Sequence, residues 1–451
     1  MNDFSQVKSN RYLMKLTIPV FIEIFLGVLI GLVDQFMLSD NKNAFNAIAQ
    51  ANQIINMLVI TFNVVAMAST ILIAQYIGSR NVEKVKQLYS LSIFVNVIFG
   101  VAISLILLFF NKPIFAMMDM PPDIAVNATK YISIVGGAMF LHAIALTFSA
   151  FFKANGFMKE SMYVTLIINI TNVVGNAVLI YGWFGLPKLG IVGVAISSII
   201  SKLVGVLLFI SLYKKQIGEK IGISQLKPFP TGPLKKILGI GVPSAGENLS
   251  YSFAMVTIQT TINKLSKRFG EHLITARTTI GLLCFMSWIF AASISSTTQV
   301  IVGYLMGAGD VEGTQKRYKA SLGIAMLLSL AGSLLLYFLA EPVVSIFSSD
   351  PDVIALCKKI LFIDIFLEQG RAVNMSTVRA LQACGDTKFP IIVGIIDVWL
   401  VAALGGYILG NVFGLGLVGV WCAMAADEII RGVIFTIRWN GGKWRKMRLV
   451  S

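Results

Sequence analysis

Long apolar runs recur along the whole of this 451-residue chain and limit the folds open to it. A helix needs about 20 predominantly apolar residues to cross a bilayer. The mean hydropathy is +0.79 and only 13% of the residues are charged, a balance that soluble domains do not show. The runs are continuous rather than alternating, which argues against a β-barrel. We therefore expect an all-α polytopic membrane protein.

Hydropathy and run length predict about twelve transmembrane helices. Several runs exceed the thickness of a membrane, so we expect their ends to tilt or to extend into water. The approximate cores are 13–37, 46–78, 88–110, 127–152, 161–184, 191–213, 237–262, 272–306, 320–340, 354–384, 389–410 and 415–437.

Basic residues in the loops predict the orientation of these helices. Lys and Arg gather at both ends of the chain, after the second and eighth spans, and in the long central loop. The opposite loops are poor in basic residues, except that after the seventh span, which carries Lys264, Lys267 and Arg268. The positive-inside rule then places both termini in the cytoplasm.

The sequence also repeats itself at half its length. The stretch GSRNVEKVKQLYSLS from Gly78 is similar to GAGDVEGTQKRYKAS from Gly307, and FKANGFMK from Phe152 to LQACGDTK from Leu381. We therefore predict two parallel six-helix bundles, residues 1–213 and 237–451, joined by a cytoplasmic linker at 214–236. Repeats of this kind are related by an axis along the membrane normal and enclose a cavity.

Polar residues form a stripe on one face of the first span. Glu23 and Asp34 lie about three turns apart on this face, with Pro19, Gly27 and Gly31 between or beside them. A carboxylate near the membrane centre costs about 2.5–3.5 kcal/mol on insertion scales. The stripe is either a close-packed helix interface, with Asp34 reaching toward the membrane surface, or the wall of a water-filled cavity with a titratable site.

The fifth span places Asn169, Asn172 and Asn176 on one face. Asparagine oxygens can ligate a cation, and asparagine NH₂ groups can donate to a carboxylate or a substrate. Hydrogen bonding between helices is an equally good explanation.

The second half carries its own intramembrane charges. Arg371 lies one turn from Glu368, which predicts an internal salt bridge because an unpaired charge would be very unfavourable there. Asp427, Glu428 and Arg431 allow similar local pairing in the last span. The polar residues of this half predict a second candidate ion or substrate site, formed by Glu247, Tyr251, Glu368, Arg371 and Asn374.

Motifs of enzymes and ATP-driven pumps are missing from the sequence. It has no Gly-rich phosphate loop, no HExxH and no nucleophile elbow, and its four cysteines have no metal-ligand spacing. The sequence thus predicts no enzyme, no cofactor and no firm metal site, although the intramembrane carboxylates leave the binding of Na⁺ or H⁺ open. We expect no nucleic-acid partner, because the net charge of +15 comes from residues that flank the spans.

Several motifs, in order, resemble those of the MATE (multidrug and toxic compound extrusion) transporters over nearly the whole chain. They are IPVFIE…LVDQFMLS, LIAQYIGSRN, FFKANGFMK, NITNVVGNAVLIYGWFGLPKLGIVGVAIS, GVPSAGENLS, EQGRAVNMSTVRALQACGDTKFP and GLGLVGVWCAMAADEIIRG. The last two are similar to one bacterial subgroup.

This resemblance implies a V-shaped pair of six-helix bundles in the bacterial inner membrane, acting as a monomer among lipids. It implies export of amphipathic, often cationic or aromatic, compounds in exchange for H⁺ or Na⁺. It also implies that Asp34 binds the coupling ion with Asn172 and Asn176, and Glu23 lies on the same face. Asn176 replaces an aspartate frequent in the family, and Arg371 stands where an acid is expected, so neither the coupling ion nor the bundle that holds it follows from the resemblance.

Two other functions remain open at this point. A lipid-precursor flippase of the same superfamily would need several basic residues in its cavity, and Lys153, Lys202, Arg277 and Arg371 are the candidates. An exporter of anionic aromatic metabolites such as flavins would suit Arg371 but not Glu23 or Asp34.

The predicted orientation can be tested by cysteine labelling. Cysteines placed at Ser224 and Ser451 should react with an impermeant reagent only from the cytoplasmic side, and one at Asn41 only from outside. Labelling of Ser224→Cys from outside would contradict both the orientation and the even number of spans.

Overall fold

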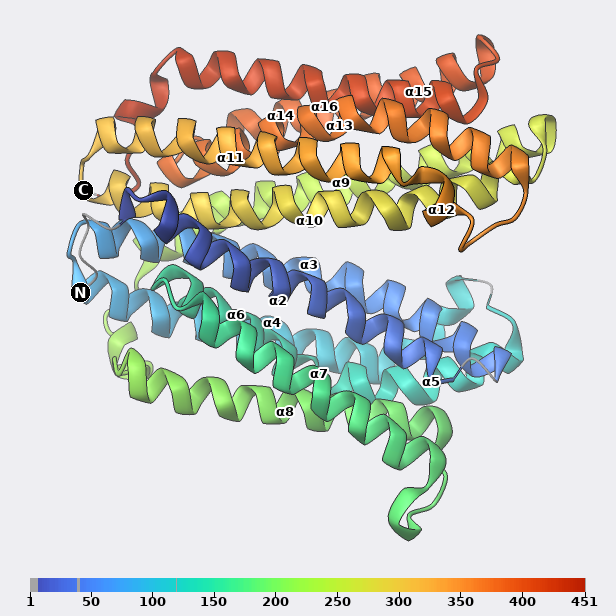
Figure 1. Cartoon of the computed structure of the whole chain (residues 1–451). Coiled ribbons are helices and arrows are strands. Elements are labelled where there is room, and N and C mark those ends of the chain that lie inside the picture. The colour runs from blue at the N-terminus through green and yellow to red at the C-terminus, as the bar shows by residue number, and fades with distance from the viewer. Residues whose placement is uncertain (1–6, 39–40, 119, 451) are drawn as a thin grey trace. The chain divides into compact units, whose positions relative to one another are not determined.

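Helices account for nearly all of the regular structure in the computed structural model, which describes residues 7–38, 41–118 and 120–450 (Figure 1). No strand occurs among these residues. Within the described ranges, eight helices are long and apolar enough to cross a membrane, or nine when a bent pair counts as one span. The predicted all-α membrane fold is therefore confirmed. Ser451, one of the proposed labelling positions, lies outside the described residues, whereas Ser224 and Asn41 are exposed within them.

The first half contains six spans at nearly the predicted positions. The fourth is a pair of helices, α5 and α6, bent by 49° at Ala138, where one continuous span was expected. The helices are α2 (Asn10–Phe36), α3 (Lys42–Gly78), α4 (Val82–Met117), α5 (Pro122–Gly137), α6 (Met139–Ala154), α7 (Met158–Tyr181) and α8 (Gly190–Gln216), with short η1 (Trp183–Gly185) and η2 (Ile223–Leu226).

The second half repeats this order. Its fifth long segment is irregular, because two π-helical stretches, η3 (Val398–Leu404) and η4 (Ile408–Val412), interrupt it. The helices are α9 (Thr231–Phe269), α10 (His272–Gly307), α11 (Val311–Phe338), α12 (Ala340–Val344), α13 (Pro351–Cys384), α14 (Lys388–Asp397), α15 (Gly405–Tyr407) and α16 (Gly416–Asn440), with η5 (Lys443–Lys446) after them. The long helices α9, α13 and α16 are not among the most apolar ones, and they carry the polar residues of the second predicted site.

Packing divides the chain into two compact units at slightly different points from the predicted halves. One unit is Ile18–Gly241, and the other joins the residues up to Thr17 with Val242–Ser451. Each boundary falls just before a proline inside a helix, Pro19 in α2 and Pro243 in α9. Helices α8 and α9 also extend into the predicted linker at 214–236, which leaves 217–230 between them.

The start of the chain is anchored within the second of these units. The Lys8 ammonium lies 2.7 Å from the Asp310 carboxylate and thereby lowers the pKa of that carboxyl group. Arg317, only 2% exposed, donates to the Lys8 carbonyl at 3.3 Å and to Asn10 Oδ1 at 2.8 Å. Lys8 and Arg317, both of which belong to the basic regions of the positive-inside pattern, therefore also fix the beginning of α2.

Close packing of α13 against α16 depends on small residues. A Cβ atom added to Gly370 would lie 2.8 Å from the backbone nitrogen of Ile429, and one added to Gly432 would lie 3.3 Å from the Gly370 carbonyl. Small residues at helix crossings let membrane helices approach this closely. The approach brings the charged residues of the two helices into contact.

Gly370→Ala should therefore lower the thermal stability of the purified protein, by about 1–3 kcal/mol as for other overpacked cores. The methyl group has to push backbone rather than a flexible side chain. Gly323→Ala is the matched control, because open space surrounds that helical glycine, and its stability should not fall. Equal melting temperatures for Gly370→Ala and wild type would contradict the close crossing.

Candidate functional site

Asp34 lies buried in the first unit, where neutral groups hold its carboxylate. Its side chain is 4% exposed. Asn176 Nδ2 on α7 donates to Asp34 Oδ1 at 2.6 Å, and Ser198 Oγ on α8 donates to Oδ2 at 3.3 Å. The structure thus brings together α2, α7 and α8 at the carboxylate that the sequence singled out.

Two of the three predicted asparagines, Asn172 and Asn176, form one network with Asp34, whereas Asn169 donates to the Thr165 carbonyl of its own helix at 2.9 Å. Asn176 Nδ2 lies 3.4 Å from Asn172 Oδ1, and Asn172 Nδ2 donates to Ser198 Oγ at 3.3 Å. Asn176 Oδ1 is buried and has no hydrogen-bond partner among the described protein groups. Carboxylate and amide oxygens are ligands that hard cations prefer, and a carboxylate can equally take up a proton. The donor set therefore fits either Na⁺ or H⁺.

Other side chains near Asp34 were missed at the sequence level. Ser198 completes the network, and Lys202, named from the sequence only as a basic residue that a flippase could use, lies one turn further along α8 and within electrostatic range of the carboxylate. Tyr131 on α5 also lies near it. Ser198 and Lys202 share a helix face, so the four-residue spacing that identified the asparagines of α7 could have found them as well.

Glu23, expected beside Asp34 on the same face, belongs to a separate group. Lys153 Nζ on α6 lies 2.9 Å from Glu23 Oε1, and Ser149 and Ser161 each donate to the same oxygen at 3.0 Å. A face shared over three turns does not mean a shared site, because each level of α2 meets different neighbours.

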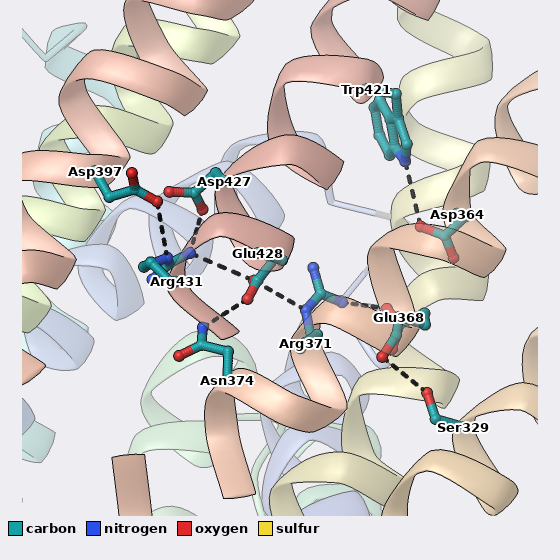
Figure 2. Close-up of polar contacts among 10 residues, drawn as sticks. All are labelled: Ser329, Asp364, Glu368, Arg371, Asn374, Asp397, Trp421, Asp427, Glu428 and Arg431. Carbon is teal, nitrogen blue, oxygen red and sulfur yellow. Dashed lines mark hydrogen bonds and ion pairs between the residues drawn. The ribbon is translucent and has the colours of Figure 1, made fainter. Parts of the chain in front are cut away.

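The second unit contains a larger charged cluster, shown in Figure 2. Arg371 on α13 donates to Glu368, as the sequence predicted, and also to Glu428 Oε1 on α16 at 3.2 Å. Asn374 Nδ2 donates to Glu428 Oε2 at 2.7 Å. Nearer the start of α13, Asp364 Oδ1 accepts a hydrogen bond from Trp421 Nε1 of α16 at 3.3 Å. The partners from α16 could not be read from the spacing on α13.

Arg431 holds the other end of this cluster. Its guanidinium pairs with Asp427, as the local spacing allowed, and lies 3.6 Å from Glu428 and 3.8 Å from Asp397 at the end of α14. Asp397 was not predicted as a site residue, although an acid inside an apolar run itself indicates a functional site.

Glu247 and Tyr251 reach the same region from α9. Glu247 Oε1 would lie 2.9 Å from a Cβ atom on Gly394 of α14, and its carboxylate is within electrostatic range of Arg379 and Arg431. Tyr251 lies near Arg371 and Glu428, with 39% of its surface exposed. All residues of the second predicted site are therefore in or beside one cluster.

The charges of this cluster do not balance. The residues drawn in Figure 2 include five carboxylates, all buried, and two guanidiniums. Buried ionised groups without partners are very unfavourable, so an excess of acids makes this cluster a candidate site for protons or cations. Among the described residues, no three His, Cys, Asp or Glu side chains converge as ligands of a metal ion.

Comparison with known proteins agrees with this architecture. The sequence model of the MatE family matches residues 19–178 and 243–408, one match in each half, as the internal repeat predicts. The uncharacterized transporter YisQ of Bacillus subtilis is 33% identical over 433 residues, which are 96% of this chain and 94% of that protein. The probable multidrug resistance protein NorM of Thermotoga maritima is 26% identical over 445 residues, 98% of this chain and 94% of its own.

A solved structure has the same fold. It is described as the outward-facing conformation of a multidrug resistance MATE family transporter of the MOP superfamily. The TM-score is 0.88 at 20% sequence identity, and the match covers 100% of this chain and 98% of that one.

Arg371→Ala should lower the thermal stability and the yield of the protein, because Glu368 and Glu428 lose their shared partner. Removing one member of a buried pair typically costs about 3–5 kcal/mol. Lys316→Ala is the control, since it breaks the ion pair with Glu312 that is exposed on both sides and should have almost no effect. A stable Arg371→Ala protein that loses only the binding of anionic compounds would contradict the structural role.

Proposed function

The chain belongs to the MatE family of transporters, and on this premise we propose that it is a secondary active efflux antiporter. It is a multi-pass membrane transporter and not an enzyme. The proposed cargo is amphipathic organic compounds, often cationic or aromatic, such as drugs and toxic metabolites. Export is driven by the entry of H⁺ or Na⁺. We further propose that it works as a monomer in the bacterial inner membrane, surrounded by lipid and with both termini in the cytoplasm.

The buried carboxylate of Asp34 is the observation that carries this proposal. Hydrogen bonds from Asn176 and Ser198 stabilise the charged form, yet neither donor carries a charge of its own. The carboxylate is therefore held by neutral donors, and Lys202 on α8 is a charged side chain within electrostatic range of it. The unpartnered Asn176 Oδ1 beside it supports binding of a cation as well as a proton.

Coupling follows if ion and cargo favour opposite states of the transporter or compete for one site. Such linkage is reciprocal, so a cargo that weakens ion binding is itself displaced by the ion. In this proposal Asp34, Asn172 and Asn176 hold the coupling ion. Glu23, paired with Lys153, shapes the same helix face without sharing the ion.

The cluster in the second unit is the competing location for coupling. Its excess of buried carboxylates supports a role in binding protons, with Glu368 and Glu247 as the first candidates. The two locations differ because several ion pairs hold the acids of the cluster, whereas neutral amide and hydroxyl groups donate directly to Asp34.

Three of the four basic residues that a lipid-precursor flippase would use have other partners, and the fourth, Lys202, lies within electrostatic range of Asp34. Lys153 pairs with Glu23, Arg371 with two glutamates, and the Arg277 guanidinium lies 5.2 Å from the Trp421 ring centroid. These contacts favour the antiporter over a phosphate-binding flippase. They also weaken the case for flavin-like anions at Arg371.

Asp34→Asn tests the proposal directly. The amide keeps the shape and part of the hydrogen bonding but fixes the charge at zero. Ion-driven efflux and cargo-induced ion release from vesicles should be abolished, whereas expression should stay intact because removal of an intramembrane charge relieves a cost. Efflux should be measured under separately imposed proton and sodium gradients, with the cargo a cationic dye.

Asp123→Asn is the matched control, since Asp123 is exposed in the first turn of α5 and should leave efflux unchanged. Efflux at the wild-type rate with the wild-type pH and Na⁺ dependence in Asp34→Asn would eliminate this coupling site. The search would then move to Glu247 and Glu368.

A further inference from the structure

A groove on the second unit lies apart from both carboxylate sites. It runs between α9 and the π-helical stretch of the next-to-last span, and its volume is about 430 Å³. Sites for small molecules commonly have about 300–1,000 Å³. The residues that line it are Val256, Thr257, Thr260, Thr261, Lys264, Trp399, Ala403, Leu404 and Tyr407.

Helix packing explains why large side chains gather in this groove. The opposite face of the irregular helix is made of glycine, and a Cβ atom on Gly410 would lie 3.0 Å from the Gly416 carbonyl of α16. The small face packs on α16, and the bulky residues are left toward α9. Trp399 Nε1 donates to Ser250 Oγ of α9 at 2.9 Å, which fixes the ring. π-Helical turns occur frequently at functional sites.

The threonines of the groove offer acceptors rather than donors. Thr257, Thr260 and Thr261 each donate their hydroxyl proton to a backbone carbonyl one turn earlier, at 3.0, 2.9 and 3.1 Å. The walls are otherwise apolar or aromatic. A ligand can therefore place a ring system between Trp399, Leu404 and Tyr407, with little demand for hydrogen bonds there.

Lys264 provides the positive charge of the groove. Among the described residues that line the groove it is the only ionisable one apart from Tyr407, and none of the described ion pairs involves it. Lys267 and Arg268 follow on the same helix, and Arg268 also donates to the Asn411 carbonyl at 3.1 Å. These three residues are the exception to the positive-inside pattern, so topology does not explain them.

We propose that this groove binds an aromatic organic anion. Its ring system packs on Trp399 and Tyr407, and its carboxylate, sulfonate or phosphate lies at Lys264. The site is independent of the coupling carboxylates, and binding to it requires no ion gradient. It gives the transporter a second recognition surface, opposite in charge preference to the acidic stripe at Asp34.

Binding of 1-pyrenesulfonate to the full-length protein in phosphatidylcholine nanodiscs tests the inference. Lys264→Gln should weaken binding about threefold or more, as expected when an accessible ion pair is lost. The same variant should bind 1-pyrenemethylammonium, a cation of the same size, as well as wild type or better. Lys267→Gln is the matched control on the same helix and should change neither affinity by more than about twofold.

The aromatic wall is tested separately with Tyr407→Ala, because the Tyr407 residue is 42% exposed and lines the groove. This variant should weaken both pyrene probes. Unchanged pyrenesulfonate affinity in Lys264→Gln, or an equal loss in Lys267→Gln, would overturn the proposal. Loss of probe binding to wild type in phosphatidylglycerol nanodiscs would overturn it too, because the anion held at Lys264 would then be a lipid headgroup.

Discussion

A charge buried away from water has to be paired, and this constraint organises the interior of both units. Arg371 and Arg431 each contact acids on more than one element, so α13, α14 and α16 meet where their charges can be shared. The glycine crossing at Gly370 and Gly432 brings the two longer helices close enough for these contacts. Packing and electrostatics are therefore coupled here, since separating the helices would leave carboxylates without partners.

The two units meet the constraint in different ways. In the first, amide and hydroxyl groups hold Asp34, and the one ion pair on the same helix lies at another level, between Glu23 and Lys153. In the second, guanidiniums and carboxylates form a network with an excess of acids. The two halves thus carry two unlike polar centres, one built on neutral donors around a single carboxylate and one built on ion pairs.

Breaks, prolines and π-helical turns place side chains in positions that a regular α-helix would not give them. The break between α5 and α6 bends a span by 49°, and prolines lie at both points where α2 and α9 pass between packing units. The π-helical stretches turn Trp399 and Tyr407 toward α9 while glycines face α16. These departures cost regular hydrogen bonding and are typical of places where function needs a particular geometry.

The sequence alone determined the all-helical membrane class and the order and approximate bounds of the long helices, because hydropathy and length act along one dimension. Helical periodicity also identified Asp34, the asparagines of α7 and the Arg371–Glu368 pair. The two members of that pair lie within one helical turn, and the asparagines that contact Asp34 lie in a motif of the family. Periodicity could not find Lys153 as the partner of Glu23, Glu428 as the second partner of Arg371, or Asp397 beside Arg431. Those contacts join residues far apart in the chain. They depend on the rotation of each helix about its own axis and on which helices pack against it. Tertiary packing decides the rotation and the neighbours, since side-chain shape at the helix crossings fixes which faces meet.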